Sequence, residues 1–553
     1  MAKRAPRLRY VVGLVAVLGV LAAACGGGDN KAGSGTSNAG GSSGNSKPVS
    51  GGKVTYGLEA EDSGGWCIPE AQLDISGIQV ARAIYDTLTV PDATGQYKPF
   101  LATAVTPNAT FDEWTIALRP GVTFHDGSAL DATVVKNNID AWRGTYEGRN
   151  PLLFRFVYDN IKDVTVVDPM TVKVSTKVPW ASFPAFLFWS GRAAIIGQAQ
   201  LDDKATCDSK LIGTGPFVQK EWKVGQKFVA TKNPKYWQKD KDGTQLPYLD
   251  EIEFRPIPDE QARVNALLAG EVNAMHTTNA ENIANLRTER DDGKVALVES
   301  DKFAEVSYWM LNVSKEPFDN LNARLAVANA IDMDTYNKIM NLNLLQRASG
   351  PFGPGSVGYL EDTGFPTYDP KKAKDYVAKY TQETGKPLEF TVTTTADPSS
   401  LKSAQLIQEQ LKQVGASVKI KSVEQATLID TALGNDWNAI AWRNHPGGNP
   451  DEQYIWWKGG SPVNFNKFKD PQMDSLLDQG RAEPDKEKAA TIYESINKRF
   501  AEQAYNFWLN WIQWDVGTAP TVKGVYGPNL PDGSEPFPGL ATGHPVTGLY
   551  VSK

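Results

Sequence analysis

Hydrophobic and polar residues follow two different periods along most of this chain. A period of two residues is typical of half-buried strands, and a period near 3.6 is typical of amphipathic helices. By these patterns we expect strands at 53–58, 114–118, 122–124, 164–167, 170–174, 249–255, 308–312, 388–394, 417–422, 436–442 and 505–514. We expect helices at 78–88, 132–142, 260–269, 323–331, 399–414 and 487–500. The strand–helix–strand order over 388–422 predicts a parallel βαβ unit, and the alternation in two long blocks predicts a two-lobed α/β protein.

The amino terminus has a pattern of its own. Four basic residues precede Val11–Ala24, an apolar run too short to span a bilayer as a helix. This pattern predicts a secretory signal peptide over residues 1–24. Cys25 follows three alanines and precedes three glycines, which looks like a bacterial lipobox. We therefore expect a mature chain that begins at Cys25 with a lipid on its thiol; the alternative is an ordinary signal that leaves Cys25 free.

Residues 25–52 are mostly Gly, Ser and Asn, so they have almost nothing to bury. Such a composition predicts a flexible tether, with a root-mean-square span on the order of 30 Å. Beyond the signal, no segment is apolar enough to cross a bilayer. The body is therefore expected to be extracytoplasmic and held to the cell membrane by lipid alone.

Charge and composition narrow the partners. The 553-residue chain has a formal net charge of −7, which becomes −11 once the signal's four basic residues are removed. An acidic body without basic clusters argues against nucleic acid and anionic lipid as partners. The 15 Trp, 19 Tyr and 21 Phe residues leave aromatic surface for a cleft, although most rings are expected in the core.

Two cysteines remain after Cys25. In an exported protein, Cys67 and Cys207 most simply form one disulfide, and two free buried thiols are the alternative.

No catalytic or metal-binding motif is recognisable. The four histidines are His125, His276, His445 and His544, and none belongs to a His-Glu-x-x-His sequence. The chain also has no Gly-x-Ser-x-Gly elbow and no paired-cysteine metal spacing. We therefore expect no enzyme activity, metal or cofactor. The rival classes are a secreted hydrolase, whose triad would be spatial, and a structural surface lipoprotein without a hinged cleft.

The stretch from residue 441 to 458 is the strongest candidate for a site. The strand at 436–442 should end near Trp442, followed by a loop rich in Pro and Gly that carries Arg443, Asn444 and His445. Ligands of open α/β sheets bind at the carboxyl ends of strands. Arg443 offers a bidentate fork for a carboxylate or phosphate. The alternative is a surface loop in which Trp442 fills the core and Arg443 faces solvent.

The order of motifs resembles the family 5 extracellular solute-binding proteins of bacterial ABC importers, the peptide, nickel and opine group. The matching motifs are Ile84–Leu88, Pro99–Ala102, Trp114–Gly127, Gly213–Phe217, Asn233–Trp237, Leu311–Asn312, Pro317–Phe318, Arg324–Ala326 and Ala330–Asp332. They are collinear and cover the chain from about Gly52 onward.

The resemblance implies a type II periplasmic-binding-protein clamshell with an extra subdomain inserted in its first lobe. The implied boundaries are 53–90, 207–301 and 516–553 for the first lobe, 91–206 for the inserted segment, and 302–515 for the second lobe. Closure about the two crossing strands would trap a solute and present it to the permease subunits of an importer. The expected solute is a peptide or peptide-like compound, and the alternative is an opine-like, sugar-phosphate or metal-chelate anion. We expect a monomer.

The resemblance also places candidate contacts in the second lobe. Members that take dipeptides hold the ammonium group with an Asp whose place falls on Asn444 or His445 here, so that charge is missing. Asp451 and Glu452 would supply it if the loop folds differently. A basic residue for the peptide carboxylate falls on Lys402, or on Leu401 if the register slips by one.

Candidate contacts in the first lobe follow the first strand. The family places backbone groups beside the solute at the positions of Glu59 and Ala60. Trp66 would form the opposite wall of the cleft, or else a core ring beside the disulfide.

Overall fold

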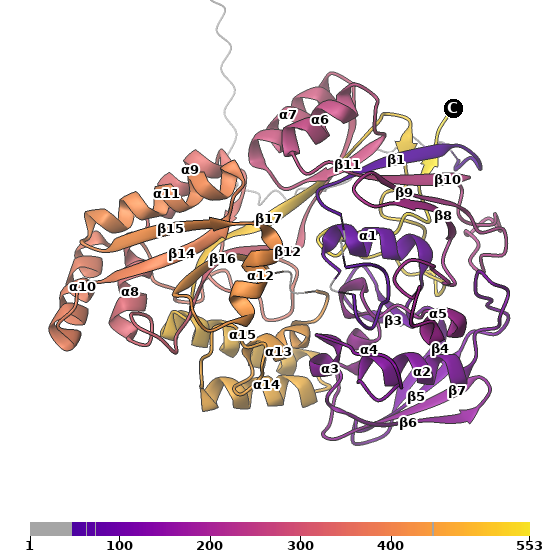
Figure 1. Cartoon of the computed structure of the whole chain (residues 1–553), viewed down its shortest axis with the longest axis horizontal. Coiled ribbons are helices and arrows are strands. Elements are labelled where there is room, and N and C mark those ends of the chain that lie inside the picture. The colour runs from indigo at the N-terminus through magenta and orange to yellow at the C-terminus, as the bar shows by residue number, and fades with distance from the viewer. Residues whose placement is uncertain (1–46, 62–63, 72, 445–446) are drawn as a thin grey trace, which may run out of the picture. The chain divides into compact units, whose positions relative to one another are not determined.

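The computed structural model describes residues 47–553 except 62–63, 72 and 445–446 (Figure 1). The chain divides into two units, residues 1–45 and 46–553, and the described elements belong to the second. The expected signal peptide, Cys25 and most of the expected tether lie outside the described residues, as does His445.

Strands and helices alternate along the described residues. The strands are β1 (Lys53–Leu58), β2 (Thr89–Pro91), β3 (Tyr97–Pro99), β4 (Ala102–Pro107), β5 (Glu113–Leu118), β6 (Ile161–Asp168), β7 (Thr171–Thr176), β8 (Phe217–Lys223), β9 (Lys227–Lys232), β10 (Glu251–Pro256), β11 (Ala274–Thr277), β12 (Ala296–Leu311), β13 (Gln346–Arg347), β14 (Glu389–Thr395), β15 (Ser417–Val423), β16 (Ala439–Asn444), β17 (Asn506–Thr518), β18 (Val522–Lys523) and β19 (Tyr550–Val551). The helices are α1 (Ile75–Ile84), α2 (Ala132–Trp142), α3 (Phe154–Val157), α4 (Phe183–Phe186), α5 (Gln198–Asp202), α6 (Glu260–Leu268), α7 (Ala280–Asp291), α8 (Leu321–Ala330), α9 (Met333–Asn341), α10 (Pro370–Thr384), α11 (Pro398–Gln413), α12 (Gln425–Leu433), α13 (Tyr454–Trp457), α14 (Pro471–Ala482) and α15 (Lys486–Gln503), with short 3-10 turns η1 (Trp189–Gly191) and η2 (Pro450–Gln453).

One large mixed sheet organises these elements. Its strand order is β15-β14-β16-β12-β17-β11-β1-β10-β9-β8, with β13 paired to β17 off this path. We call β11, β1, β10, β9 and β8 its first half and β16, β14 and β15 its second half. The predicted βαβ unit is confirmed, because β14 and β15 pair in parallel and α11 connects them and contacts both.

The strands β12 and β17 join the two halves and are long enough to belong to both. Ser300 of β12 pairs with Trp514 of β17, but the next pair is Glu305 with Ile512. Four residues of β12 therefore face a single residue of β17, and Phe303 among them has a left-handed φ of 51°. Such an irregularity bends a strand pair. It lies beside the expected lobe boundary at residue 301, which itself stays a prediction.

The inserted segment contains a second sheet of four strands, in the order β4-β5-β7-β6, and α2 packs against β6 and β7. The hairpin expected at 164–174 is confirmed by the antiparallel pair β6 and β7. The strand expected at 122–124 is wrong: Thr123 makes only an isolated bridge with Ala129, since turns on both sides leave no room for a ladder.

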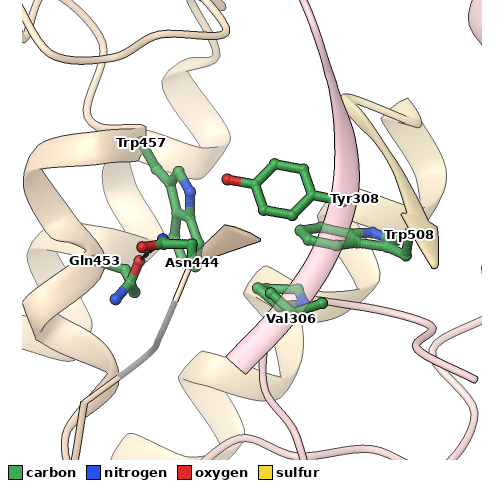
Figure 2. Close-up of a pocket in the computed structure, with 7 residues that line it drawn as sticks. Val306, Tyr308, Asn444, Gln453, Trp457 and Trp508 are labelled. Carbon is green, nitrogen blue, oxygen red and sulfur yellow. Dashed lines mark hydrogen bonds between the residues drawn. The ribbon is translucent and has the colours of Figure 1, made fainter. Parts of the chain in front are cut away.

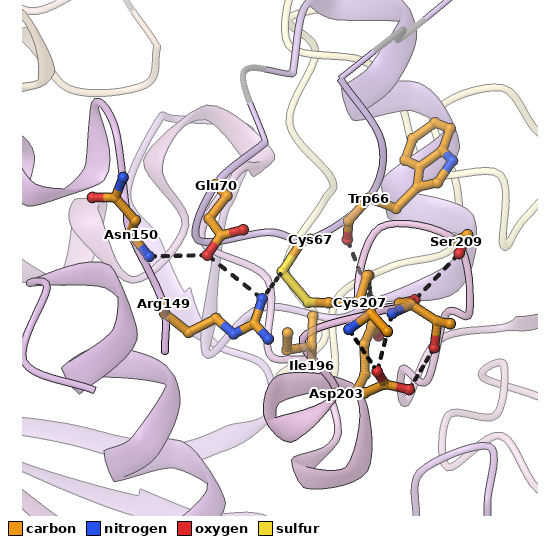
Figure 3. The surroundings of a disulfide bond; sticks show 12 residues. Trp66, Cys67, Glu70, Arg149, Asn150, Ile196, Asp203, Cys207 and Ser209 are labelled. Atoms are coloured by element: carbon orange, nitrogen blue, oxygen red, sulfur yellow. Dashed lines mark hydrogen bonds and ion pairs between the residues drawn. A yellow bond between two sulfur atoms is a disulfide. The ribbon is translucent and has the colours of Figure 1, made fainter. Parts of the chain in front are cut away.

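The expected disulfide is present between Cys67 and Cys207 (Figure 3). It ties the loop after β1 to the segment after α5. Arg149 Nη1 lies 3.1 Å from the sulfur of Cys67 and 3.5 Å from the carboxylate of Glu70. Gln200 Nε2 donates to the Cys207 carbonyl at 2.7 Å, so both ends of the bridge are held by buried polar contacts.

We expect the Cys67→Ser, Cys207→Ser double variant to lose stability. The bridge closes a loop of 140 residues, and releasing such a loop should lower the free energy of unfolding by about 3–5 kcal/mol. Urea unfolding followed by circular dichroism measures this loss. The reduced wild-type protein should match the double variant, and equal stability of oxidised and variant proteins would contradict the prediction.

Candidate functional site

The strand β16 carries three of the expected site residues in the middle of the large sheet. Trp442, Arg443 and Asn444 pair with Tyr308, Ser307 and Val306 of β12. The strand was expected to end near Trp442; it runs to Asn444 because β12 offers two further partners. Neighbouring side chains of a strand point to opposite faces, so Arg443 lies on one face and Trp442 and Asn444 on the other.

Arg443 meets acidic and polar groups from both halves of the sheet. Its guanidinium lies 3.6 Å from Glu59 Oε1, which follows β1, and donates to Thr278 Oγ1 at 3.4 Å. The same Nη1 that donates to Thr278 also lies 3.9 Å from Oε2 of Glu305 on β12. The Glu305 carboxylate first, and Glu59 after it, raise the pKa of Arg443 above its usual range. The side chain still has 43% of its surface exposed, so it remains accessible to a solute.

The surroundings of Arg443 are acidic on balance. The carboxylates of Glu305, Glu59, Glu260 and Asp397 all raise its pKa, which places four acids around one guanidinium. Burial raises the pKa of Glu260. Arg263 faces Glu59 and Glu260, and Arg192 faces Glu305, so the four carboxylates meet three cations. The remaining carboxylate charge can hold one positive group.

A buried histidine lies behind this acidic group. His276 on β11 is 3% exposed, and its Nε2 lies 3.9 Å from Glu59 Oε2. Burial lowers the pKa of His276 to about 4, so its ring is neutral at neutral pH and brings no positive charge. Arg263, fully buried beside it, donates to the backbone carbonyls of His276 at 3.0 Å and Ile257 at 2.6 Å.

Lys402 lies near the start of α11 and reaches toward the other half of the sheet. Its Nζ is 3.9 Å from Glu281 Oε1 on α7, and 52% of its side chain is exposed. Asp397 caps α11 by accepting from the Ser400 amide at 2.8 Å. Lys402 thus makes a second ion pair between the halves, apart from that of Arg443.

The face of β16 opposite Arg443 borders a narrow pocket (Figure 2). Asn444 donates to Gln453 Oε1 at 2.5 Å, and the Tyr308 and Trp508 rings lie 5.0 Å apart between their centroids. The pocket is too narrow for a water-sized sphere. Its lining residues are Val306, Tyr308, Pro351, Asn444, Gln453, Trp457 and Trp508. Sequence reasoning missed this aromatic set, although the many rings in 505–514 were its signal.

Three further expectations have different outcomes. Trp66 is 2% exposed and packs edge-on against Trp222 and Phe228, so its ring belongs to the core beside the disulfide and does not line the site. The backbone amide of Ala60, which the resemblance places beside the solute, donates to Ser76 Oγ at 3.2 Å in this structure. Trp442 is half-buried, with its ring 5.7 Å from that of Phe465.

Asp451 and Glu452 do not supply the missing charge beside Asn444. They are 1% and 2% exposed. Arg481 and Trp180 bind Asp451, and Tyr97 and Ser190 bind Glu452. These partners occupy both carboxylates, and the acids that approach Arg443 are Glu59 and Glu305. Among the described residues, no group of three His, Cys, Asp or Glu side chains could hold a metal ion. No helix in the described part of the chain is long and apolar enough to span a membrane.

The two halves share one large sheet, and the strands β12 and β17 pass between them. Charged side chains from the two halves meet near these strands. Together these features indicate the fold class of the protein. The chain has the two-lobed fold of the type II periplasmic binding proteins. The family model of bacterial extracellular solute-binding proteins, family 5 Middle, matches residues 96–466. This chain therefore belongs to family 5 of the bacterial extracellular solute-binding proteins, a family of transport proteins and not of enzymes.

Similar proteins differ in what they bind. The glutathione-binding protein GsiB of Salmonella paratyphi A is 30% identical over 348 residues, which cover 62% of this chain and 65% of that protein. The structure of AgaA from A. tumefaciens R10 in complex with agropinic acid is 24% identical, has a TM-score of 0.79, and covers 91% of this chain and 99% of its own. Helicobacter pylori DppA in complex with the peptide STSA is 24% identical with a TM-score of 0.78 and the same coverage. At such identity, the two structures establish the fold alone.

Proposed function

We propose that this protein binds a small peptide or peptide-like solute outside the cytoplasm and delivers it to the permease of an ABC importer. The observation that carries the proposal is the meeting of Glu59, Thr278 and Arg443 from the two halves of the sheet, which leaves polar groups accessible between them. Membership of family 5 supports the role in transport. We place the hinge for closure around a solute at the irregular pairing of β12 and β17.

The charges of the site favour a solute with an ammonium group. Arg443 is already offset by Glu59 and Glu305, and further carboxylates surround it. A buried ammonium needs a counter-charge, and Glu59 provides one although Asn444 is uncharged. Peptides and glutathione carry an ammonium together with carboxylates, for which the exposed fork of Arg443 is suited. The second candidate is an opine-like, sugar-phosphate or metal-chelate anion, favoured by the same fork of Arg443.

The amino-terminal assignments complete the proposal. Residues 1–24 act as a signal peptide, Cys25 carries the lipid, and residues 25–52 are the tether.

The first lobe consists of residues 53–90, 207–301 and 516–553, the inserted segment of residues 91–206, and the second lobe of residues 302–515. The protein acts as a monomer, and the tether keeps it close to the permease, which raises its effective concentration there.

A bound solute should stabilise the protein and remain chemically unchanged. At a concentration of one hundred times its Kd, a solute adds about 2.7 kcal/mol to the free energy of unfolding. Thermal unfolding against glutathione, dipeptides, tetrapeptides and opines measures the shift, and mass spectrometry of solute released from fresh protein identifies it. Turnover of the solute would support the hydrolase instead. If no solute stabilises the protein, and if small-angle scattering is the same with and without the solutes, the structural lipoprotein is supported.

A further inference from the structure

Two consecutive acidic residues are buried where the inserted segment contacts the second lobe. Asp451 and Glu452 lie in η2, shortly after β16, and are 1% and 2% exposed. Buried carboxylates are rare and require partners. Here most of the partners come from the inserted segment, more than 260 residues away in sequence.

Asp451 is bound from both sides of this contact. Trp180 Nε1 donates to its Oδ2 at 3.0 Å, and the Ser182 hydroxyl donates to the same oxygen. From its own lobe, Nε of Arg481 lies 3.1 Å from both oxygens. The Ala181 amide also donates to the Arg481 carbonyl at 2.8 Å, so a backbone hydrogen bond crosses the contact beside Asp451.

Two neutral hydroxyl groups of the inserted segment donate to Glu452. The Tyr97 hydroxyl donates to Oε1 at 2.7 Å and the Ser190 hydroxyl donates to Oε2 at 2.6 Å. The charged or titratable groups that face it are Arg192, Tyr97 and Tyr158. Burial, only partly offset by the two hydroxyls, the Asn449 backbone amide and Arg192, raises the pKa of Glu452 to about 7.

We propose that Asp451 and Glu452 form a latch that docks the inserted segment onto the second lobe. The latch is closed while Glu452 is protonated, with its proton donated to one of the two hydroxyl oxygens, and is weakened when Glu452 ionises. This inference rests on the proposed function, because docking is one of the contacts that hold the two lobes together around a solute. The latch is also connected to the site: Gln453, the next residue, accepts a hydrogen bond from Asn444 of β16. Solute affinity should therefore follow the docking equilibrium.

The direction of the pH effect follows from the two states of Glu452. Undocked, its carboxyl reaches water and returns toward its ordinary pKa of 4.5; docked, its pKa is about 7. The docked state therefore binds the proton more tightly. Docking is strongest below about pH 4.5, weakens as the pH rises through about 7, and is constant above that. The equilibrium should change by about tenfold or more between pH 5 and pH 8.

Hydrogen–deuterium exchange of the Ala181 amide tests the latch without any solute, so its outcome does not depend on whether the solute has been identified. On the purified full chain, and after correction for intrinsic exchange, protection should fall about tenfold or more from pH 5 to pH 8. Glu452→Gln keeps a donor and an acceptor without the charge, so its protection should stay at the acidic level of the wild type. Glu452→Ala should lose protection at both values.

The matched control is Glu361→Gln, which removes the same charge from an exposed loop position and should behave as the wild type. Protection of Ala181 that is independent of pH in the wild type would overturn the latch. A Glu452→Gln variant that keeps the wild-type pH dependence would overturn it as well, as would full protection in Glu452→Ala. A solute that binds while any of these three results holds would refute the latch and leave the proposed function intact.

Discussion

Solute binding is expected to be lost when Trp442 and Arg443 are both replaced by alanine. The guanidinium of Arg443 lies 3.6 Å from the carboxylate of Glu59 in the first half and 3.9 Å from that of Glu305 on β12. Without it, two carboxylates face each other across the site, and like charges at short range oppose closure. The exposed fork that would hold a solute carboxylate is also removed. Together these effects should weaken binding by about a hundredfold or more.

Calorimetric titration with the solute that stabilises the wild type measures the loss. Folding should survive, because Trp442 is only half-buried and Arg443 is 43% exposed. Arg155→Ala, which removes the same charge from an exposed position on α3, should bind as the wild type. Undiminished affinity in the double variant would remove this part of β16 from the site.

The sign of the solute's charge can be determined with a single further variant. Glu59→Gln replaces the carboxylate next to Arg443 with a neutral amide of the same size. A solute held by its ammonium group should then bind more weakly, whereas an anionic solute should bind more tightly. The two solute classes thus predict opposite changes in the same titration.

Local patterns were sufficient for elements whose partners are near in sequence. The unit β14-α11-β15 was predicted from periodicity, and Asp397 and Pro398 at the start of α11 are the residues that favour a helix start. Pairing with distant strands was not visible. Arg443 and Asn444 extend β16 because they pair with β12. β12 itself continues through polar residues near Asp301, where the sequence shows no alternation of polar and apolar positions.

The candidate site was predicted only in part, for a related reason. Arg443 was found from its place after a strand and Glu59 from the resemblance, and the structure brings them together. Asp451 and Glu452 were expected to supply the missing charge only if the loop folds differently. Their burial depends on Trp180, Ser190 and other groups of the inserted segment, which no local pattern connects to this loop.

The second large effect is expected from Arg481, which is the cation that compensates Asp451. Its side chain is 6% exposed, and its guanidinium lies 3.5 Å from the Tyr454 ring centroid and 4.9 Å from that of Trp180. Arg481→Met retains much of the apolar packing but leaves the Asp451 charge buried. Removing one partner of a buried ion pair costs about 3–5 kcal/mol of unfolding free energy. Urea unfolding measures this loss.

The Arg481→Met, Asp451→Asn double variant separates the charge from the packing. The asparagine amide is neutral and still accepts from Trp180, so the double variant should regain at least half of the stability lost in the single variant. Two additive losses would contradict this account. In the single variant the inserted segment should also undock from the second lobe, because undocking exposes the uncompensated Asp451 carboxylate to water. The Ala181 amide should therefore lose protection in Arg481→Met and regain it in the double variant.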